Sequence, residues 1–262
     1  MEGFSKSFDV VGSVAVVETP EKAKKKELRE FAGEIMATHP RVRTVARKAG
    51  ATGGAFRVRP LQVIAGEKSL KTLHKENGCS YEVDLRKVYF QPRLSFERNR
   101  VAMLVKEGEN VLVLFAGVGP FAINIARQQK TARVVGVEIN PVAAKLFKKN
   151  VLLNKVNVKV FCEDAKKFLR RKAFLKWAHR IVMPHPTAAF KFLPAALKAC
   201  KKKATIHFYA IIENNSVAAA EKEIKKICRK KSVSAKIVLY RRALSYSPHA
   251  HQAVFDVLVK KK

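Results

Sequence analysis

From about Val83 onward the chain alternates between short apolar runs rich in β-branched residues and amphipathic helical segments, and this alternation restricts the fold more than any other feature. Repeated β-α units favour a mostly parallel sheet with helices on both faces. We therefore expect an α/β domain over residues 84–262. Its predicted strands are Asn110–Phe115, Ala132–Val137, Val158–Cys162, Ile181–Met183, Thr205–Ile211, Lys236–Arg242 and Ala253–Val259. Its predicted helices are Phe121–Gln129, Pro141–Lys149, Ala165–Lys172, Ala188–Ala199 and Val217–Lys230.

The first third of the chain has a different pattern, which is typical of a small α+β domain. Phe8–Thr19 is rich in β-branched residues around Gly12 and predicts two strands joined by a turn. Pro20 and Glu21 then open a predicted helix over Lys22–Thr38. Further short strands are predicted between Gly-rich breaks, at Val42–Ala46, Ala55–Arg59, Gln62–Ala65, Ser69–His74 and Ser80–Asp84. We therefore expect a first domain over residues 1–83.

The charge of the chain indicates a polyanionic partner. It contains 53 Lys and Arg against 21 Asp and Glu, a formal net charge of +32, and such an excess destabilises a compact chain unless a partner such as nucleic acid neutralises it. No apolar run approaches the roughly 18–20 residues of a spanning helix, and Met1–Val10 lacks the apolar core of a secretion signal. The four cysteines form no CxxC pair, which argues against a zinc site or a disulfide framework. We expect a cytoplasmic protein without a membrane segment or a metal.

The predicted strand Asn110–Phe115 ends in a glycine turn typical of nucleotide-cofactor sites. Gly117 and Gly119 let the backbone approach a ligand at the carboxyl end of this strand. Glu138, about twenty positions further on at the end of the next strand, suits the hydroxyl groups of a ribose. This much fits any adenosine cofactor.

Three features favour S-adenosylmethionine over a dinucleotide. The third glycine of the dinucleotide fingerprint is missing, Pro120-Phe121 closes the glycine turn, and a later strand ends in Cys162-Glu163-Asp164-Ala165, which places Asp164 where an adenine amino group is read. Val113 is evidence against S-adenosylmethionine, because methyltransferases of this class often carry an acidic residue at this position. The alternative is that Glu138 and Asp164 are solvated carboxylates in loops. This alternative is weaker, because the chain contains few acidic residues and two of them fall at consecutive strand ends.

The most specific part of the sequence lies between His39 and Arg100. It contains His74-Lys75-Glu76-Asn77-Gly78 and the run VYFQPRLSFER at 88–98, and it is followed by the FAGVGPF loop at 115–121. In these pieces, and over nearly its whole length, the chain resembles the archaeal and eukaryotic tRNA (guanine-N1)-methyltransferase family, which modifies guanosine 37. The wyosine-pathway tRNA aminocarboxypropyltransferases share this scaffold.

The resemblance implies a class I S-adenosylmethionine-dependent methyltransferase sheet, Rossmann-like in its topology, preceded by a small α+β connecting domain. It also implies S-adenosylmethionine as the donor, the anticodon stem-loop of tRNA as the acceptor, and a monomeric enzyme. Family members usually carry a further N-terminal module that grips the outer corner of the tRNA. Because Phe8 already begins the connecting domain, we expect that module to be absent here.

Methylation at guanine N1 requires a general base on the protein, since this nitrogen holds a proton at neutral pH. The resemblance assigns the base to Glu97, and it assigns to Arg57 the stabilisation of charge that develops on the guanine O6. Without the motif, Glu97 is half of a helix-surface ion pair with Arg93 or Arg100. Arg59 is an alternative to Arg57, because alternation along a strand places both on one face.

The predicted cofactor site combines the strand ends with residues implied by the resemblance. For Tyr89, packing in the core is the alternative. The predicted set is Tyr89, Arg98, Phe115, Gly117, Gly119, Glu138, Ile139, Asp164, Ala165 and Pro186.

One departure from the family lies at the end of the fourth strand. Family methyltransferases place an Asn-Leu-Pro-like tetrapeptide there, whereas this chain has Met183-Pro184-His185-Pro186. Pro184 removes both an amide side chain and a backbone N–H. We therefore expect base recognition to differ here, with His185 either as a substitute hydrogen-bond partner or as a structural residue.

Two other functions stay open from the sequence. The wyosine-pathway transferases also depart at this strand end, so the first alternative is transfer of a 3-amino-3-carboxypropyl group from the same donor to a tricyclic base. The presence of Glu97 favours methylation. The second alternative is an RNA-binding module without catalysis, motivated by Val113, Pro184 and the charge.

Overall fold

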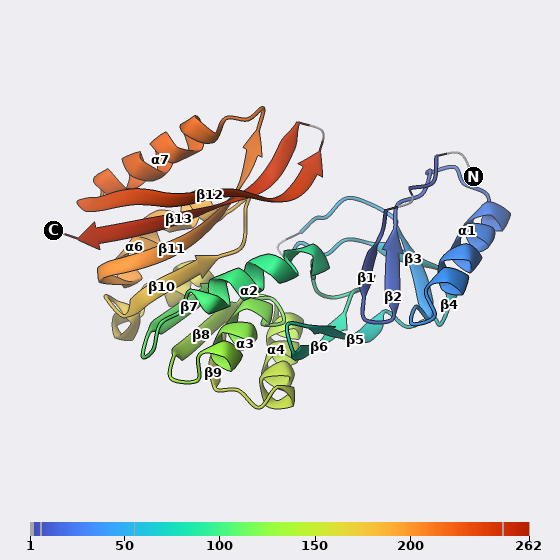
Figure 1. The fold of residues 1–262 in the computed structure, drawn as a ribbon, viewed down its shortest axis with the longest axis horizontal. Coiled ribbons are helices and arrows are strands. Elements are labelled where there is room, and N and C mark those ends of the chain that lie inside the picture. Colours follow the sequence, from blue (N-terminus) through green and yellow to red (C-terminus); the bar gives the residue numbers. More distant parts are fainter. Residues whose placement is uncertain (1–2, 6, 55, 248, 262) are drawn as a thin grey trace.

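A seven-stranded sheet forms the larger part of the computed structural model, which describes residues 3–5, 7–54, 56–247 and 249–261 (Figure 1). The five strands from β11 to β9 run parallel, and β13 is antiparallel to both β11 and β12. The predicted, mostly parallel sheet is therefore confirmed. In spatial order its strands are β12 (Val233–Ser247), β13 (Ala250–Lys261), β11 (Cys200–Glu213), β10 (Ala178–Met183), β7 (Asn110–Leu114), β8 (Arg133–Glu138) and β9 (Val158–Cys162).

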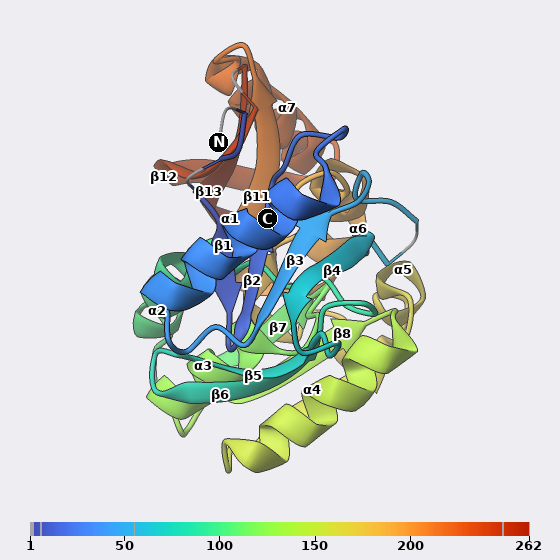
Figure 2. The same cartoon turned by 90° about the vertical axis from the view of Figure 1, so that its right-hand side faces the viewer.

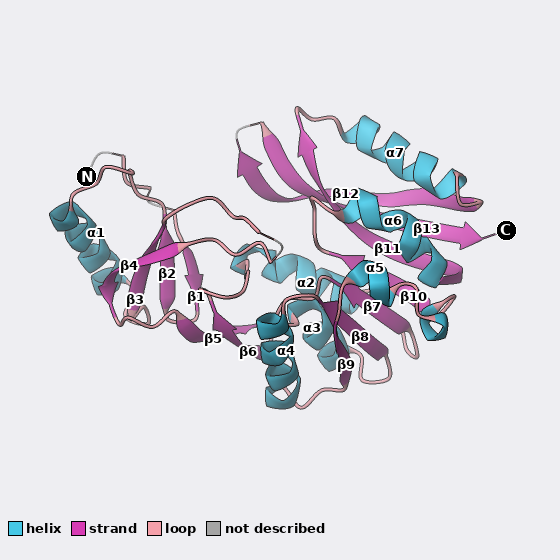
Figure 3. Ribbon diagram, turned by 180° about the vertical axis from the view of Figure 1, so that it is seen from behind, coloured by secondary structure: helices cyan, strands magenta, loops and turns pink. Residues whose placement is uncertain are grey.

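Helices cover both faces of this sheet (Figure 3). Successive residues of β7 point to opposite faces: Val111 and Val113 pack in one apolar cluster, and Leu112 and Leu114 in another. The first cluster lies under α2 (Ser95–Met103), α3 (Pro120–Gln128) and α4 (Pro141–Leu153). The second lies under α5 (Ala165–Phe168), α6 (Ala189–Ala199) and α7 (Val217–Arg229).

The small α+β unit consists of a four-stranded sheet and one helix. The sheet order is β1 (Asp9–Val11), β2 (Val14–Val17), β3 (Thr44–Lys48) and β4 (Leu61–Gly66). Helix α1 (Lys25–Thr38) lies across this sheet (Figure 2), and its apolar side joins residues of β2 and β3 in one cluster.

Two predictions in this unit were wrong. Helix α1 starts at Lys25 rather than Lys22, because the Glu27 carboxylate accepts the Lys24 backbone N–H at 2.8 Å and so fixes the first turn there. Ala55–Arg59 is not a strand, although Ala55 itself lies outside the described residues. Arg57 has a φ of 52°, which no strand residue adopts, and only a single bridge joins Gly53 to Val58.

A separate hairpin joins the two parts of the molecule. It consists of β5 (Lys71–Glu76) and β6 (Cys79–Asp84), joined by Asn77-Gly78 with positive φ at both residues, as tight two-residue turns require. On one side the backbone N–H groups of Gly12 and Ser13 donate to His74 and Thr72 of β5 at 3.1 and 2.8 Å.

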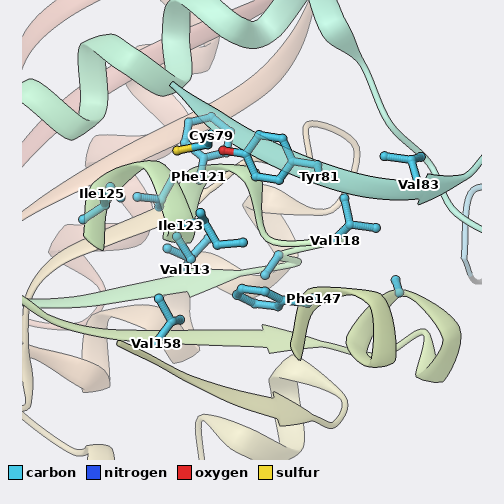
Figure 4. Close-up of a cluster of buried hydrophobic side chains, with 14 of the residues drawn as sticks. Cys79, Tyr81, Val83, Val113, Val118, Phe121, Ile123, Ile125, Phe147 and Val158 are labelled. Atoms are coloured by element: carbon cyan, nitrogen blue, oxygen red, sulfur yellow. The ribbon is translucent and has the colours of Figure 1, made fainter. Parts of the chain in front are cut away.

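On its other side the hairpin is fixed to α4. The Asn150 and Asn154 amide oxygens accept the Glu82 and Ser80 N–H groups at 2.7 and 2.8 Å. Cys79 and Tyr81 of β6 also enter the large apolar cluster beside Phe121 of α3 (Figure 4). The proposed division into residues 1–83 and 84–262 stays a prediction.

None of the described helices is long and apolar enough to cross a membrane. Cys79, Cys200 and Cys228 are buried free thiols, while Cys162 is exposed. Within the described part of the chain, no group of His, Cys, Asp or Glu is arranged to hold a metal.

Candidate active site

A cavity of about 670 Å³ lies where loops of the small unit face the carboxyl ends of the large sheet's strands. The short 3-10 helix η1 (Pro92–Leu94) contributes to one wall, and β12 and β13 contribute Leu244, Ser245 and Gln252 to another. The structure brings seven of the twelve predicted site residues to this cavity: Arg57, Tyr89, Phe115, Gly117, Glu138, Ile139 and Pro186. The other five do not line it: Glu97, Arg98, Gly119, Asp164 and Ala165.

The two glycines of the predicted turn have different roles. A Cβ built at Gly117 would meet only the Tyr89 carbonyl oxygen, at 3.9 Å, so this backbone is open to a ligand. A Cβ at Gly119 would lie 2.1 Å from the Phe147 ring, and one at Gly136 2.4 Å from the same ring. Gly119 is therefore required for packing α4 on the sheet, and its contact with the cofactor stays a prediction.

Glu138 is held firmly at the cavity wall. Its two carboxylate oxygens accept the backbone N–H groups of Gly117 and Asn140, each at 2.7 Å, and its burial raises the pKa of this carboxyl. Each oxygen keeps a further lone pair for a hydroxyl group. This arrangement, together with the open backbone at Gly117, fits the ribose of an adenosine cofactor.

Asn140 was missed by the sequence analysis. Its side chain caps α4 by accepting the Val142 N–H at 3.0 Å, and its amide donates to the Lys87 carbonyl at 2.8 Å. It thus connects the loop after β8 with the loop that carries Tyr89. An Asn before the first-turn proline Pro141 is a recognisable helix cap, and this signal was available in the sequence.

The prolyl loop after β10 forms the opposite wall. The ring of Phe115 packs edge-on against His185 at 5.1 Å between centroids. The Arg57 guanidinium donates to the Thr187 hydroxyl at 3.1 Å, and this hydroxyl lies 3.3 Å from His185 Nδ1. Burial and the charge of Arg57 lower the pKa of His185, so the ring is neutral at pH 7. Arg57 therefore connects the small unit directly to this loop.

Arg57 and Arg59 make different contacts in the structure. Arg59 donates to Thr52 at 3.0 Å within its own loop, although it also lines the cavity. Tyr89 is 47% exposed, so the alternative of packing in the core was wrong.

Glu97 is buried and does not line the cavity. Its Oε2 accepts hydrogen bonds from Arg100 at 3.0 Å and from the Tyr209 hydroxyl at 3.3 Å. Its Oε1 lies 3.4 Å from the Arg241 guanidinium, without a hydrogen-bond partner among the described residues. Of the two partners in the alternative, Glu97 pairs with Arg100, whereas Arg93 pairs with Asp9. The Glu97–Arg100 pair is largely buried, so the prediction of a surface pair was wrong.

Arg98 does not line the cavity, and its contact with the cofactor stays a prediction. Its buried guanidinium forms two hydrogen bonds of 2.5 Å with the Glu76 carboxylate and donates to the Gln91 carbonyl at 3.1 Å. It therefore positions the loop that carries Tyr89 and Gln91. Asp164 is turned to its own helix, where Oδ1 accepts the backbone N–H groups of Lys166 and Lys167.

A buried polar network extends from Glu97 through the sheet. Asp256 of β13 accepts two hydrogen bonds from Arg100 and one from His207 Nδ1 at 2.6 Å. His207 Nε2 faces the Arg180 guanidinium at 2.8 Å, and since Arg180 can only donate, this nitrogen must be the unprotonated acceptor. His207 is therefore neutral, in agreement with its pKa, which burial lowers.

The state of His207 predicts a loss of stability in mild acid. Below about pH 6.5 the unfolded chain binds a proton at this histidine and the folded chain does not, so the free energy of unfolding falls with pH by up to about 1.4 kcal/mol per unit. His207→Gln removes this titration, and the stability profile of the variant should be flatter than that of the wild type between pH 5 and 6.5. Parallel profiles would contradict this prediction.

Comparisons with known proteins agree with this architecture. The TRM5/TYW2 methyltransferase domain model matches residues 72–237, and the TYW2 N-terminal domain model matches residues 1–69. The chain is 35% identical to tRNA (guanine(37)-N(1))-methyltransferase Trm5b of Pyrococcus abyssi, over 97% of this chain and 74% of that protein. The crystal structure of that Trm5b superposes with a TM-score of 0.87, over 97% of this chain and 75% of that one.

Two further relatives come from the wyosine pathway. The chain is 33% identical to tRNA 4-demethylwyosine(37)-methyltransferase Taw21 of Saccharolobus solfataricus, over 96% of this chain and 93% of that protein. The structure of Pyrococcus horikoshii TYW2 in complex with MeSAdo is 25% identical and has a TM-score of 0.84, over all of this chain and 93% of that one. Since the methyltransferase model covers most of the chain and these relatives match nearly all of it, the chain belongs to the TRM5/TYW2 family of S-adenosylmethionine-dependent tRNA methyltransferases.

Proposed function

We propose that this protein transfers the methyl group of S-adenosylmethionine to N1 of guanosine 37 in tRNA, and that it acts as a monomer on the anticodon stem-loop. The observation that carries the proposal is the cavity, in which Arg57 of the small unit faces the open backbone at Gly117 and the carboxylate of Glu138. Relatives named as guanosine-37 methyltransferases, at 35% and 34% identity, support the same reaction.

In this proposal the cofactor lies against the carboxyl ends of β7 and β8. The Glu138 carboxylate accepts hydrogen bonds from the ribose hydroxyls, and Gly117 lets the backbone approach the cofactor. Tyr89, Phe115, Ile139 and Pro186 line the same cavity. When bound, S-adenosylmethionine supplies an electrophilic methyl group on a sulfonium centre.

Glu97 accepts the N1 proton of guanine, so that the nitrogen lone pair becomes available for the methyl group. Arg100 and Tyr209 hold Oε2 of this carboxylate, which leaves Oε1 as the proton acceptor. The Arg57 guanidinium stabilises the negative charge that grows on O6, an interaction that is stronger in the transition state than in the ground state.

The charge of +32 makes tRNA binding sensitive to salt. Neutralising phosphates with Lys and Arg releases condensed cations, so the affinity falls steeply as salt rises. Between 50 and 200 mM salt we expect the affinity for tRNA to fall about a hundredfold or more, while the affinity for S-adenosylmethionine changes little. A flat tRNA response over this range, measured by filter binding, would be evidence against a phosphate-dominated interface.

Nucleoside mass spectrometry tests the proposed reaction directly. The protein is incubated with S-adenosylmethionine and an unmodified tRNA transcript that carries guanosine at position 37, and the tRNA is then digested to nucleosides. The expected product is 1-methylguanosine, located at position 37 by fragment mapping. A gain of an aminocarboxypropyl group, or no gain at all, would overturn the proposal.

A second candidate substrate is 4-demethylwyosine at the same position. Two observations favour it: the chain covers 93% of the length of Taw21, and Pro184 stands where guanosine-37 methyltransferases are expected to carry an asparagine. Incubation with tRNA that already contains this tricyclic base, followed by the same mass measurement, decides whether it also receives a methyl group.

A further inference from the structure

One amide side chain in the cavity wall has no partner in the structure. Gln252 of β13 lines the cavity and is only 5% exposed, and its Nε2 forms no hydrogen bond with any residue that the structure describes. A buried donor without an acceptor costs roughly 1–3 kcal/mol. Such a group at a cavity wall is best explained by an acceptor that arrives with a ligand.

The other amides of the cavity wall are already engaged. Asn140 is bonded through both its oxygen and its nitrogen, and the Gln91 oxygen accepts the Arg93 N–H at 3.2 Å, while the Gln91 amide nitrogen is not a buried unpaired donor. Pro184 and Pro186 offer no backbone N–H at the end of β10. Among the described cavity residues, Gln252 is therefore the one whose amide donor is both buried and unpaired.

Gln252 also lies on the same side of the sheet as Glu97. Residues alternate along a strand, so Gln252, Val254 and Asp256 of β13 share one face. Asp256 holds Arg100, which in turn holds Glu97, and Tyr209, which donates to Glu97, pairs with Val254 in the neighbouring strand. The unpaired amide thus lies on the face of the sheet that carries the hydrogen-bond network of the proposed base.

We infer that Gln252 contacts the target base and donates its amide N–H to the O6/N7 edge of the guanine. This inference rests on the proposed function. O6 and N7 are the acceptors that guanine presents on one edge, and a purine taken out of the RNA stack is read by such hydrogen bonds in its pocket. Gln252 thereby supplies, from β13, the amide that Pro184 cannot supply from β10.

The test replaces Gln252 by methionine, which keeps the length of the side chain and removes the donor. For a tRNA transcript with guanosine 37, we expect kcat/KM to fall about tenfold to a hundredfold, as for a lost buried hydrogen bond. The dissociation constant of S-adenosylmethionine should not change. The unfolding midpoint should not fall, because the substitution removes an unpaired polar atom. Gln128→Met, the same change on the exposed end of α3, is the matched control and should behave as the wild type.

A transcript with inosine 37 tests the assigned edge, because inosine lacks the exocyclic amine but keeps O6 and N7. Gln252→Met should lower kcat/KM on inosine by the same factor as on guanosine. An effect that disappears on inosine, an unchanged kcat/KM on guanosine, or a lowered unfolding midpoint that accounts for the lost activity would each overturn the inference. Absence of methylation by the wild type would instead refute the proposed function, so the two failures are distinguishable.

Discussion

Replacing Glu97 by glutamine is expected to slow methyl transfer about a hundredfold to ten-thousandfold in a single turnover, the usual contribution of a positioned general base. Glutamine has nearly the same shape, and its amide oxygen can still accept from Arg100 and Tyr209 in the position of Oε2. The variant loses the free Oε1 lone pair that would take the N1 proton. Arg100 keeps Asp256 as its counter-charge and Arg241 is partly exposed, so we expect a smaller loss of stability than at a buried pair without a second acid, and the main effect on the chemical step.

Rapid-quench measurement with enzyme in excess over tRNA isolates this step from product release. The dissociation constant of S-adenosylmethionine, measured by calorimetry, should agree with the wild-type value within a factor of about two. Glu107→Gln, an exposed loop change, serves as the control. A wild-type single-turnover rate for Glu97→Gln would remove this residue from the role of base.

Replacing Glu76 by glutamine is expected to lower the free energy of unfolding by about 3–5 kcal/mol, because it leaves the Arg98 guanidinium buried without a counter-charge. The side chains of both residues are almost entirely buried, and two hydrogen bonds of 2.5 Å join them. Burial alone would raise the pKa of Glu76, but hydrogen bonds from His74 and Arg98 lower it, so the pair is ionised at neutral pH.

Urea denaturation monitored by circular dichroism measures this loss. The double variant Glu76→Gln/Arg98→Met should recover much of the stability, since it removes the unpaired charge as well. The control is Glu82→Gln, which breaks the half-exposed pair with Lys149 and should cost less than about 1 kcal/mol. A loss at Glu76 no larger than that at Glu82 would show that the buried pair contributes little.

The sequence alone predicted the main sheet well, because β-α alternation is a local signal repeated many times. It also predicted those residues of the cavity wall that follow the ends of strands, such as Gly117 and Glu138. It did not reveal the packing role of Gly119, because two glycines in one turn look alike until the position of Phe147 is known. The Ala55–Arg59 segment has strand-like composition, but Arg57 adopts a positive φ, which its composition does not signal.

Apart from the i+3 pair with Arg100, the polar network around Glu97 was not predictable from local pattern. Tyr209, Arg241 and Asp256 lie more than a hundred positions away in the chain, and no motif marks them. Gln252 was missed for the same reason, since its chemistry depends on the absence of a partner rather than on a spacing. The family resemblance identified Arg98 as important, but only the hairpin geometry shows that its partner is Glu76.

The hairpin of β5 and β6 has a consequence for how a nucleotide reaches the cavity. It is bonded to the β1–β2 turn on one side and to α4 on the other, and Gly12 leaves no room for a side chain between them, since a Cβ there would lie 2.1 Å from the Thr72 hydroxyl. We therefore expect the hairpin to keep the spacing of the two units fixed when tRNA binds, because hydrogen bonds hold it on both sides. In the proposed reaction the target nucleotide would then reach the cavity by turning out of its stack rather than by the enzyme opening.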